Sequence, residues 1–558
     1  MNAKSGPDSE YSRPSRNGQF LFFVLEYKQQ LREKSRQMRK FPIILILVFS
    51  LLSFSALFAD EEKDSLSFWP TNGKKLFLNE KIDLFLLYFP NAINNNGHQE
   101  PEGNGNSYLD DYSQRIRESI THFSLAYNQS SPFSLKIPQK LIRQQEISKN
   151  YIRPALEITS INMILWSFNR YIMNEDWANV SLDSILKNLR IGPAWDIDTY
   201  ITNHLGHPFH GATHYSIARG NGMNFLESTL YSTFGSFTWE YFLESIRPST
   251  NDLLLNTLGG ITLGELLYRT AGLIIDESSV GIERAIREFL AFVVNPGNFH
   301  RLTSGKAFRI GYPPEERFYS LKLPVGAYGT SMENPWFIIA ANLEYNDYLK
   351  SDLTLLNPYE WFSLDFRLGF QDYRAQDQEI FTTGILAGRK VRNGVAGLFG
   401  VFDYINSHIM DRMSAIGVGP GIFVVTDLDS DYYLNTTGLL TIILGGSSPS
   451  INGSNGHFGT KLDDPYYFGP GMLGRFKFEL GKKGLGSIHT GYSQYWVHSI
   501  FDSANEFLGI LTFKVNCEVS DWSQISLGYD YYLRYATLYD ERYSGAKPAV
   551  RALYILKF

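Results

Sequence analysis

Residues 511–519 alternate strictly between apolar and polar side chains. Apolar side chains stand at every odd position from Leu511 to Val519, and polar side chains from Thr512 to Glu518 stand between them. A period of two places successive side chains on opposite faces of an extended chain, so this segment is predicted to be a β-strand with one apolar face. Residues 523–535 repeat the pattern, which predicts an antiparallel neighbour.

The same alternation recurs throughout the C-terminal half and predicts about twelve strands. They are 316–328, 336–347, 359–370, 379–389, 395–405, 412–425, 431–444, 467–480, 484–497, 505–518, 523–535 and 548–558. A soluble β-sandwich also alternates, but strands of about 9 to 11 residues with aromatic side chains at both ends are typical of a membrane barrel. An even strand number is what bacterial single-chain barrels have. It places both ends of the barrel on the periplasmic side, so we expect loop 445–465 to face outward.

The last segment, PAVRALYILKF, places five apolar side chains on one face and ends on Phe558. It resembles the C-terminal strand of outer-membrane barrels. The predicted fold is therefore α+β, with a membrane antiparallel β-barrel over residues 316–558 and an N-terminal helical domain. The opposite faces of the strands carry charges that need water or a polar plug inside the barrel. These positions are Asp365, Arg367, Lys477, Glu479, Lys514, Glu518, Asp530 and Arg534.

The N-terminal region is predicted to direct export. Residues 38–59 join Arg39 and Lys40 to an apolar run and a small residue, Ala59, as a secretory signal peptide does. A transmembrane anchor is the alternative, but the run is shorter than the roughly 20 residues that a spanning helix needs. Residues 1–37 have no folding pattern and are interpreted as a disordered upstream extension, with Met38 as a possible true start. Residues 60–150 are predicted to be a mixed, loop-rich periplasmic segment.

The composition limits the classes of partner that the protein can bind. The formal charge of −6 points to no nucleic-acid partner, and the single cysteine, Cys517, cannot form an internal disulfide. Aromatic residues make up 15% of the chain. This content, with only moderate hydrophobicity, fits apolar residues that alternate with polar ones in an outer-membrane barrel that contacts lipid.

Residues 151–305 change to a helical pattern. A helix is predicted to open near Pro154, and helical spacing returns in SLDSILKNL, WEYFLESI, NDLLLNTLGGITLGELLYRTAGLII and GIERAIREFLAFVV. Gly260 and Gly264 form a G-x-x-x-G pair. We expect close helix packing there rather than a transmembrane dimer, because Asn256 and Glu265 interrupt the apolar run.

This region resembles the uncharacterised bacterial DUF3943 family over roughly residues 155–300. The resemblance is carried by an Asn-His-x-x-His-Pro segment, an Ala-Arg-x-x-Gly segment, a Trp-Glu-Tyr segment and a Pro-Ser-x-Asn-Asp segment followed by a Gly-Gly helix. It implies an exported envelope protein. The resemblance implies no established activity for any residue of this chain.

The segment NHLGHPFHGATHY contains His204, His207, His210 and His214. If a helix begins at Pro208, His210 and His214 share one face and His207 can fold onto the same side. Three readings remain open: a hydrogen-bonded network between helices, an acid–base or nucleophilic site, and a metal site. The candidate catalytic residues are His204, His207, His210, His214, Glu240, Glu244 and Asp252, with Ser228 or Ser236 as a nucleophile. The candidate metal ligands are His207, His210, His214 and Glu240, with Glu244 and Glu265 as further carboxylates.

Known motifs do not decide among these readings. The HExxH pattern of zinc proteases is absent, and the glycines at 220–222 and 259–260 lack the context of a phosphate loop. No cofactor other than a divalent metal is predicted. The leading functional hypothesis is an outer-membrane protein that binds or passes a small solute or lipid, with the helical domain on the periplasmic face or inside the lumen. The alternative is an outer-membrane hydrolase of lipid or envelope polymer that uses the His and Glu residues of the helical domain. A third hypothesis is a purely structural anchoring role.

Overall fold

The computed structural model describes residues 149–558, apart from 197, 309–318, 331–334, 350–352, 372–373, 410, 450–465, 501–502 and 539–540. The predicted upstream extension, the signal peptide and nearly all of segment 60–150 lie outside the described residues. Most of loop 445–465 does so too.

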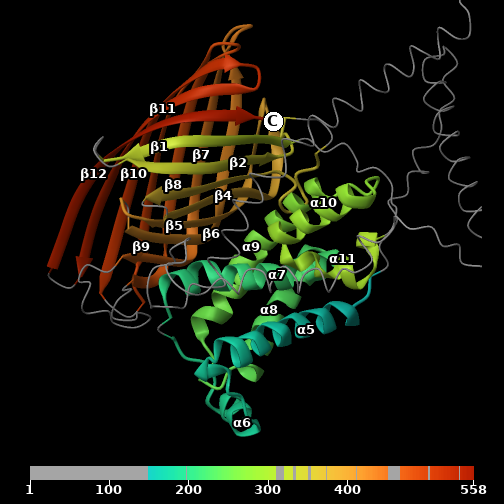
Figure 1. Cartoon of the computed structure of the whole chain (residues 1–558). Helices are drawn as coiled ribbons and strands as arrows, with labels where there is room; N and C mark the ends of the chain where they lie inside the picture. Colours follow the sequence, from blue (N-terminus) through green and yellow to red (C-terminus); the bar gives the residue numbers. More distant parts are fainter. Residues whose placement is uncertain are drawn as a thin grey trace, which may run out of the picture. The chain divides into compact units, whose positions relative to one another are not determined.

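The described part of the C-terminal half forms one closed antiparallel barrel of twelve strands (Figure 1). The strands are β1 (Tyr319–Gly329), β2 (Trp336–Tyr345), β3 (Phe362–Gln371), β4 (Arg374–Val391), β5 (Gly394–Ser407), β6 (Asp411–Asp427), β7 (Tyr432–Pro449), β8 (Tyr466–Lys482), β9 (Gly486–His498), β10 (Ala504–Ser520), β11 (Ser523–Leu538) and β12 (Glu541–Lys557). Each strand pairs with its neighbours in sequence, and β1 pairs with β12 to close the ring. The predicted barrel and its strand number are confirmed.

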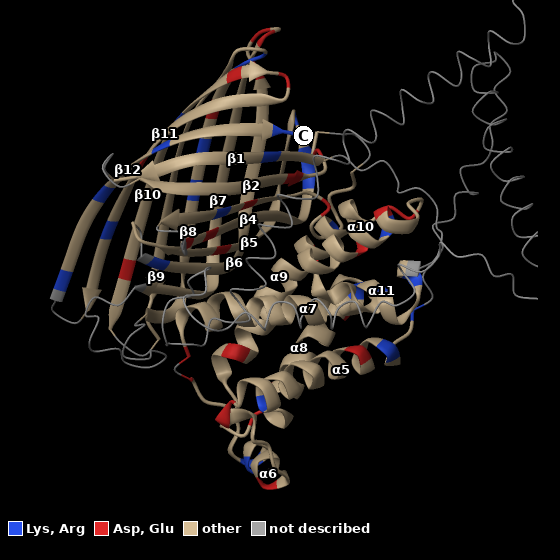
Figure 2. Cartoon of the chain, viewed as in Figure 1, with Lys and Arg blue, Asp and Glu red and all other residues tan. Residues whose placement is uncertain are grey.

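Contacts between strands that are not neighbours identify the inner face. Arg475 on β8 lies 2.5 Å from Asp403 on β5, and Tyr495 on β9 donates a hydrogen bond to the same carboxylate at 2.8 Å. Such contacts can form only across the lumen, so these positions point inward and the alternate positions point outward. Charged positions recur along the strands in Figure 2, as this alternation requires.

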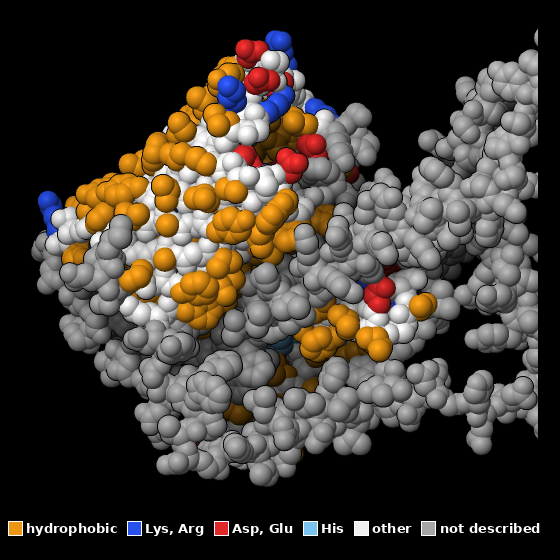
Figure 3. Space-filling model, turned by 45° about the horizontal axis from the view of Figure 1, so that its top comes forward, with side chains coloured by type: hydrophobic (Ala, Val, Ile, Leu, Met, Phe, Trp, Pro, Cys, Tyr) orange, Lys and Arg blue, Asp and Glu red, His pale blue; other side chains and the backbone are white. Residues whose placement is uncertain are grey.

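The outward positions of the later strands are apolar and uncovered by described residues. Leu511, Phe513, Leu527 and Tyr529 each expose more than 40% of their surface. Figure 3 shows hydrophobic side chains gathered over the barrel wall and charged side chains at one rim. Phe558 and the alternate positions of β12 that precede it belong to this outer face, as predicted.

The lumen is filled by side chains rather than open. One connected cluster of buried apolar residues takes members from strands around the ring, among them Ile338, Val401, Leu473 and Leu508. Beside it, the Arg475 and Asp403 side chains are 5% and 0% exposed. The described side chains therefore close the barrel interior without an added plug.

The helices precede the barrel. They are α5 (Ile152–Phe168), α6 (Leu182–Ile191), α7 (His207–Gly220), α8 (Phe225–Phe242), α9 (Thr250–Ile274), α10 (Gly281–Val294) and α11 (Phe299–Thr303), with short turns η2 (Asn169–Met173), η3 (Asp176–Ala178), η4 (Thr202–Gly206), η5 (Pro296–Asn298) and η6 (Lys306–Phe308). The helix predicted from Pro208 begins one residue earlier, because the π-helical turn η4 runs directly into α7. Among the described helices, none is both long and apolar enough to cross a membrane.

Glycines let α7 and α9 approach closely. A Cβ atom at Gly211 would lie 1.8 Å from the Asn256 carbonyl oxygen, and one at Gly264 would lie 2.8 Å from the Tyr215 ring. Gly260 likewise faces Gly211. The expected close packing at the G-x-x-x-G pair is thus confirmed, with α7 as its partner.

The helices contact the outer wall of the barrel. Tyr404 points outward because its neighbour Asp403 points inward, and Tyr200 stacks on its ring at 5.3 Å between centroids. The Tyr200 hydroxyl also donates a hydrogen bond to the Ile405 carbonyl at 2.8 Å. Residues of α9, among them Leu255 and Leu263, join one buried cluster with outward residues of the early strands.

This placement corrects the expectation that the helices plug the lumen, whereas their position on the periplasmic side stays a prediction. The physical reason is that the lumen is already filled by strand side chains, whereas the outward apolar faces of β1–β5 need cover. Packing them against α9 removes apolar surface of both partners from contact with solvent.

Candidate functional site

The histidine segment is divided among three environments. His204, on η4, is buried against Tyr200, Tyr466 and Phe468, and its Nδ1 lies 2.8 Å from the Ser414 hydroxyl. Burial, followed by the charge of His207, lowers the pKa of His204 to about 3. This imidazole is therefore neutral, and it connects the helices to the barrel wall.

His210 and His214 form a second environment on α7. Both Nε2 atoms lie within hydrogen-bond distance of the same Asn162 Oδ1, at 2.9 and 2.7 Å. Burial lowers the pKa of His214 to about 3 and places that of His210 well below its usual value. Because an amide oxygen only accepts, both rings donate from Nε2, which ties α7 to α5.

His207 faces the first turns of α9. Its Nε2 lies 3.2 Å from Asp252 Oδ2, and its Nδ1 lies 3.3 Å from the Asn256 amide nitrogen. The helix rise of 1.5 Å per residue separates His207 from His214 by about 10 Å along α7. The group of potential ligand atoms around His207 does not include His214, whose Nε2 faces Asn162 instead.

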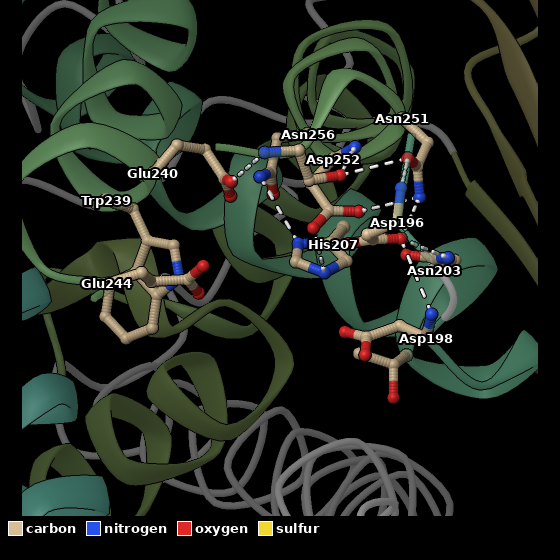
Figure 4. Close-up of polar contacts among 12 residues, drawn as sticks. Asp196, Asp198, Asn203, His207, Trp239, Glu240, Glu244, Asn251, Asp252 and Asn256 are labelled. Carbon is tan, nitrogen blue, oxygen red and sulfur yellow. Dashed lines mark hydrogen bonds and ion pairs between the residues drawn. The ribbon is translucent and has the colours of Figure 1, made fainter. Parts of the chain in front are cut away.

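The residues around His207 form a buried carboxylate–histidine cluster (Figure 4). One ligand atom from each of Asp198, His207 and Asp252 lies within 4.8 Å of the others. Asp196 accepts hydrogen bonds from the side-chain amides of Asn251 at 2.5 Å and Asn203 at 3.3 Å. Three segments of chain supply this cluster: the stretch before η4, the start of α7 and the start of α9.

The local sequence explains how α9 reaches this position. Ser249 caps α9 by accepting a hydrogen bond from the Asp252 backbone N–H at 3.1 Å. Its own backbone N–H donates to Glu240 Oε2 at 2.8 Å. The Pro-Ser-x-Asn-Asp segment thus ends the turn after α8 and directs the first side chains of α9 toward His207.

The carboxyl groups of the cluster differ in charge. Burial, and then the neighbouring Asp196 and Glu240, raise the pKa of Asp252 well above its usual range. Burial also acts to raise the pKa of Asp196, but hydrogen bonds from Asp252 and Asn251 outweigh it and lower that pKa. Asp252 therefore holds a proton more tightly than Asp196 does.

Glu240 and Glu244 lie at the end of α8. Burial and the charge of Glu244 raise the pKa of Glu240 well above its usual value. Glu244 accepts a hydrogen bond from the Trp239 indole at 2.7 Å. Glu240 is not among the three residues whose ligand atoms converge, so the ligand set expected for a metal is not assembled as a unit in the described residues.

The candidate nucleophiles and the remaining carboxylate have other partners. Ser236 Oγ accepts a hydrogen bond from the Asn256 amide at 3.1 Å, and Ser228 Oγ is buried with no hydrogen-bond partner among the described residues. Glu265 is held by Arg219 at 2.7 Å and Arg269 at 2.8 Å. Glu265 is therefore a structural anion balanced by two arginines.

Sequence reasoning identified His207 and Asp252 but missed Asp196, Asp198 and Asn203. The available signal was the Asp-x-Asp pair of WDIDTY, which stands immediately before the Asn-His motif. Such a cluster can share a proton or hold a cation.

A second concave feature lies at the barrel end where β1 begins and β12 ends. This vestibule has a volume of ≈ 450 Å³. Its wall includes Lys322, Lys482, Lys483, Lys557, Glu479, Glu518 and Asp521. The lining is polar and carries charges of both signs.

The comparison with protein families concerns the helical region. Residues 192–297 match the family model described as "Domain of unknown function (DUF3943)", which confirms the resemblance for that segment. No curated protein matches the chain.

Several solved outer-membrane proteins are similar to part of this chain, at low identity and low TM-score. The beta domain of the Bordetella autotransporter BrkA is 12% identical, with a TM-score of 0.22, covering 44% of this chain and 100% of that one. The COG4313 outer membrane channel from Pseudomonas putida F1 is 10% identical, with a TM-score of 0.22, covering 44% and 97%. The CymD monoaromatic hydrocarbon channel is 8% identical, with a TM-score of 0.20, covering 44% and 89%. These likenesses concern the fold alone.

Proposed function

We propose that this protein is an outer-membrane β-barrel that binds a small polar solute in its vestibule and does not act as an open pore. The membrane setting is supported by the closed ring of strands and its apolar outer wall. In hydrocarbon every backbone N–H and C=O group needs a partner within the protein, and a closed barrel provides one. The even strand number brings both barrel ends to the vestibule rim, which supports a periplasmic vestibule because bacterial barrels begin and end there.

The closed lumen is the observation that carries the proposal. Arg475, Asp403 and Tyr495 come from three strands and contact one another in the barrel interior. The apolar cluster that includes Leu473 and Leu508 fills the space beside them. A solute that enters the vestibule would have to separate these contacts to pass, so binding is favoured over free passage.

The vestibule supports a polar ligand rather than a lipid. Lysines and carboxylates both line it, and Lys557 pairs with Glu518 at its wall. Charged groups of both signs suit a small solute with several hydrogen-bonding groups, whereas an acyl chain would gain little from this lining.

Conductance in a planar bilayer tests the proposal. The purified chain should show heat-modifiable migration on gels, which reports barrel folding, and should insert without steady current. Joint replacement of Arg475 and Asp403 by alanine should produce measurable conductance. A steady open-channel current from the unmodified protein would overturn the proposal.

An outer-membrane hydrolase remains a second candidate, favoured by the carboxylate–histidine cluster. Asp198, whose backbone carbonyl accepts a hydrogen bond from the outward-facing Tyr466, places this cluster beside the barrel wall. In this reading His207 is the base and Asp252 shares its proton. Incubation with outer-membrane lipid, read by mass spectrometry of released fatty acid, should show turnover that His207→Ala abolishes without loss of barrel folding. Absence of turnover with the unmodified protein would remove this candidate for lipid substrates.

A further inference from the structure

We propose that Asp198, His207 and Asp252 bind a divalent transition-metal cation. This site is distinct from the vestibule and does not rest on the function proposed for the barrel. It also differs from the ligand set expected from the sequence, because His210, His214 and Glu240 are not part of it.

The geometry is the first support. The three ligand atoms lie within 4.8 Å of one another, and His207 Nε2 and Asp252 Oδ2 are 3.2 Å apart. Ligands bound to one tetrahedral zinc ion at 2.0 to 2.2 Å are about 3.3 to 3.6 Å apart. A cation therefore needs the most distant pair to move together by no more than about 1.5 Å.

The burial of the ligands is the second support. Asp252 and His207 are 2% and 9% exposed, whereas exposed acidic groups often lie together without binding a metal.

An unsatisfied acceptor is the third and independent support. Asn203 is fully buried, and its amide nitrogen donates to Asp196 Oδ1 at 3.3 Å, which places the side chain at the cluster. Its Oδ1 has no hydrogen-bond partner among the described residues. A buried acceptor without a donor is costly, and a cation or a water bound to that cation would satisfy it.

The donor set indicates the class of metal. Imidazole nitrogen suits zinc, iron and copper, while carboxylate and amide oxygens suit magnesium, calcium and manganese. One imidazole with carboxylates therefore favours a first-row divalent metal such as Zn²⁺ or Mn²⁺ over Ca²⁺ or Mg²⁺. A ligating histidine usually donates its other ring N–H to a fixed acceptor. The Asn256 amide nitrogen lies 3.3 Å from His207 Nδ1, so metal binding at Nε2 requires this amide to turn and present its oxygen to the Nδ1–H.

Metal titration of the full chain in detergent tests the proposal. The protein is dialysed against EDTA, freed of chelator and titrated with Zn²⁺ or Mn²⁺ by calorimetry, with metal content measured after gel filtration. We expect one equivalent of bound metal. Asp198→Asn and His207→Gln should each weaken binding at least tenfold. Ca²⁺ should bind more weakly than either probe.

The matched control is Asp276→Asn, which makes the same change at another half-buried aspartate outside the cluster. This control should bind metal as the unmodified protein does. Asp198 lies in the stretch before η4 rather than inside a helix, so its replacement should leave barrel migration and helical circular dichroism unchanged. Less than a tenth of an equivalent bound by the unmodified protein would overturn the proposal. Equal affinity in Asp198→Asn would overturn it too.

Discussion

Replacing Asp403 with asparagine removes the negative charge that balances Arg475 inside the barrel. The two side chains are 2.5 Å apart and only 0% and 5% exposed. Removing one partner of a buried ion pair leaves an uncompensated charge, which typically costs about 3 to 5 kcal/mol of folding free energy. We expect Asp403→Asn to lower the unfolding free energy of the barrel by roughly this amount.

Urea unfolding of the detergent-solubilised barrel, followed by tryptophan fluorescence, measures this loss. The matched control is Glu518→Gln at the rim, where Glu518 and Lys557 also form an ion pair but are 25% and 23% exposed. Partly exposed pairs contribute about 0 to 1 kcal/mol. The control variant should therefore unfold close to the unmodified protein.

Comparing the stabilities of these two variants tests whether the barrel lumen is closed. If Asp403→Asn costs no more than Glu518→Gln, water reaches Arg475 and the interior is open. The double variant Arg475→Met with Asp403→Leu should regain most of the lost stability, because apolar residues of similar size often replace a buried pair at little cost.

Three further predictions concern the helical domain. Gly211→Ala should destabilise the domain by about 1 to 3 kcal/mol, because the new methyl group would lie 1.8 Å from a carbonyl oxygen of α9. Limited proteolysis reports the effect, and Gly206→Ala, whose nearest atom is 3.8 Å away, should have almost none. Burial lowers the pKa of His300 to about 4, below its unfolded value of 6.5. As the pH falls, the unfolded chain binds this proton before the folded chain does. The free energy of unfolding therefore falls by about 1.4 kcal/mol per pH unit between pH 6.5 and pH 4. His300→Asn should reduce this pH dependence in acid titrations. Tyr200→Phe removes the hydrogen bond from the Tyr200 hydroxyl to the Ile405 carbonyl on β5, which should weaken the packing of the helices on the barrel by about 1 kcal/mol. Protease should then release the helices faster. An unchanged rate would argue against the contact between Tyr200 and the barrel wall.

The sequence predicted the barrel well because alternation is a local property. Segment 523–535 became β11, Ser523–Leu538, and segment 316–328 became β1, Tyr319–Gly329. Every second side chain faces the same way in a strand, so the pattern alone separates the two faces.

Alternation does not reveal what covers an outward face. Phe362 and Phe366 on β3 show the same pattern as Leu527 on β11, yet the first two are buried beneath helices and the last is exposed. The position of the helical domain therefore could not be predicted from periodicity. It depends on contacts between segments that are far apart in sequence.

The candidate site was predicted in part for a similar reason. Helical spacing grouped His207 with His210 and His214, but it carries no information about which helix each one faces. His207 faces α9, whereas His214 faces α5. Asp198 enters the cluster through an irregular segment before η4, to which no periodicity applies.

The central claim is that the outward faces of the later strands contact lipid hydrocarbon. Spin labels placed one at a time along residues 525–535, in a Cys517→Ser background reconstituted into bilayers, test it most directly. Labels at Leu527 and Tyr529 should collide with dissolved oxygen and be shielded from a water-soluble nickel complex, whereas labels at Ser526 should be shielded from oxygen. Nickel access at Leu527 and Tyr529 equal to that of a loop position would contradict the account.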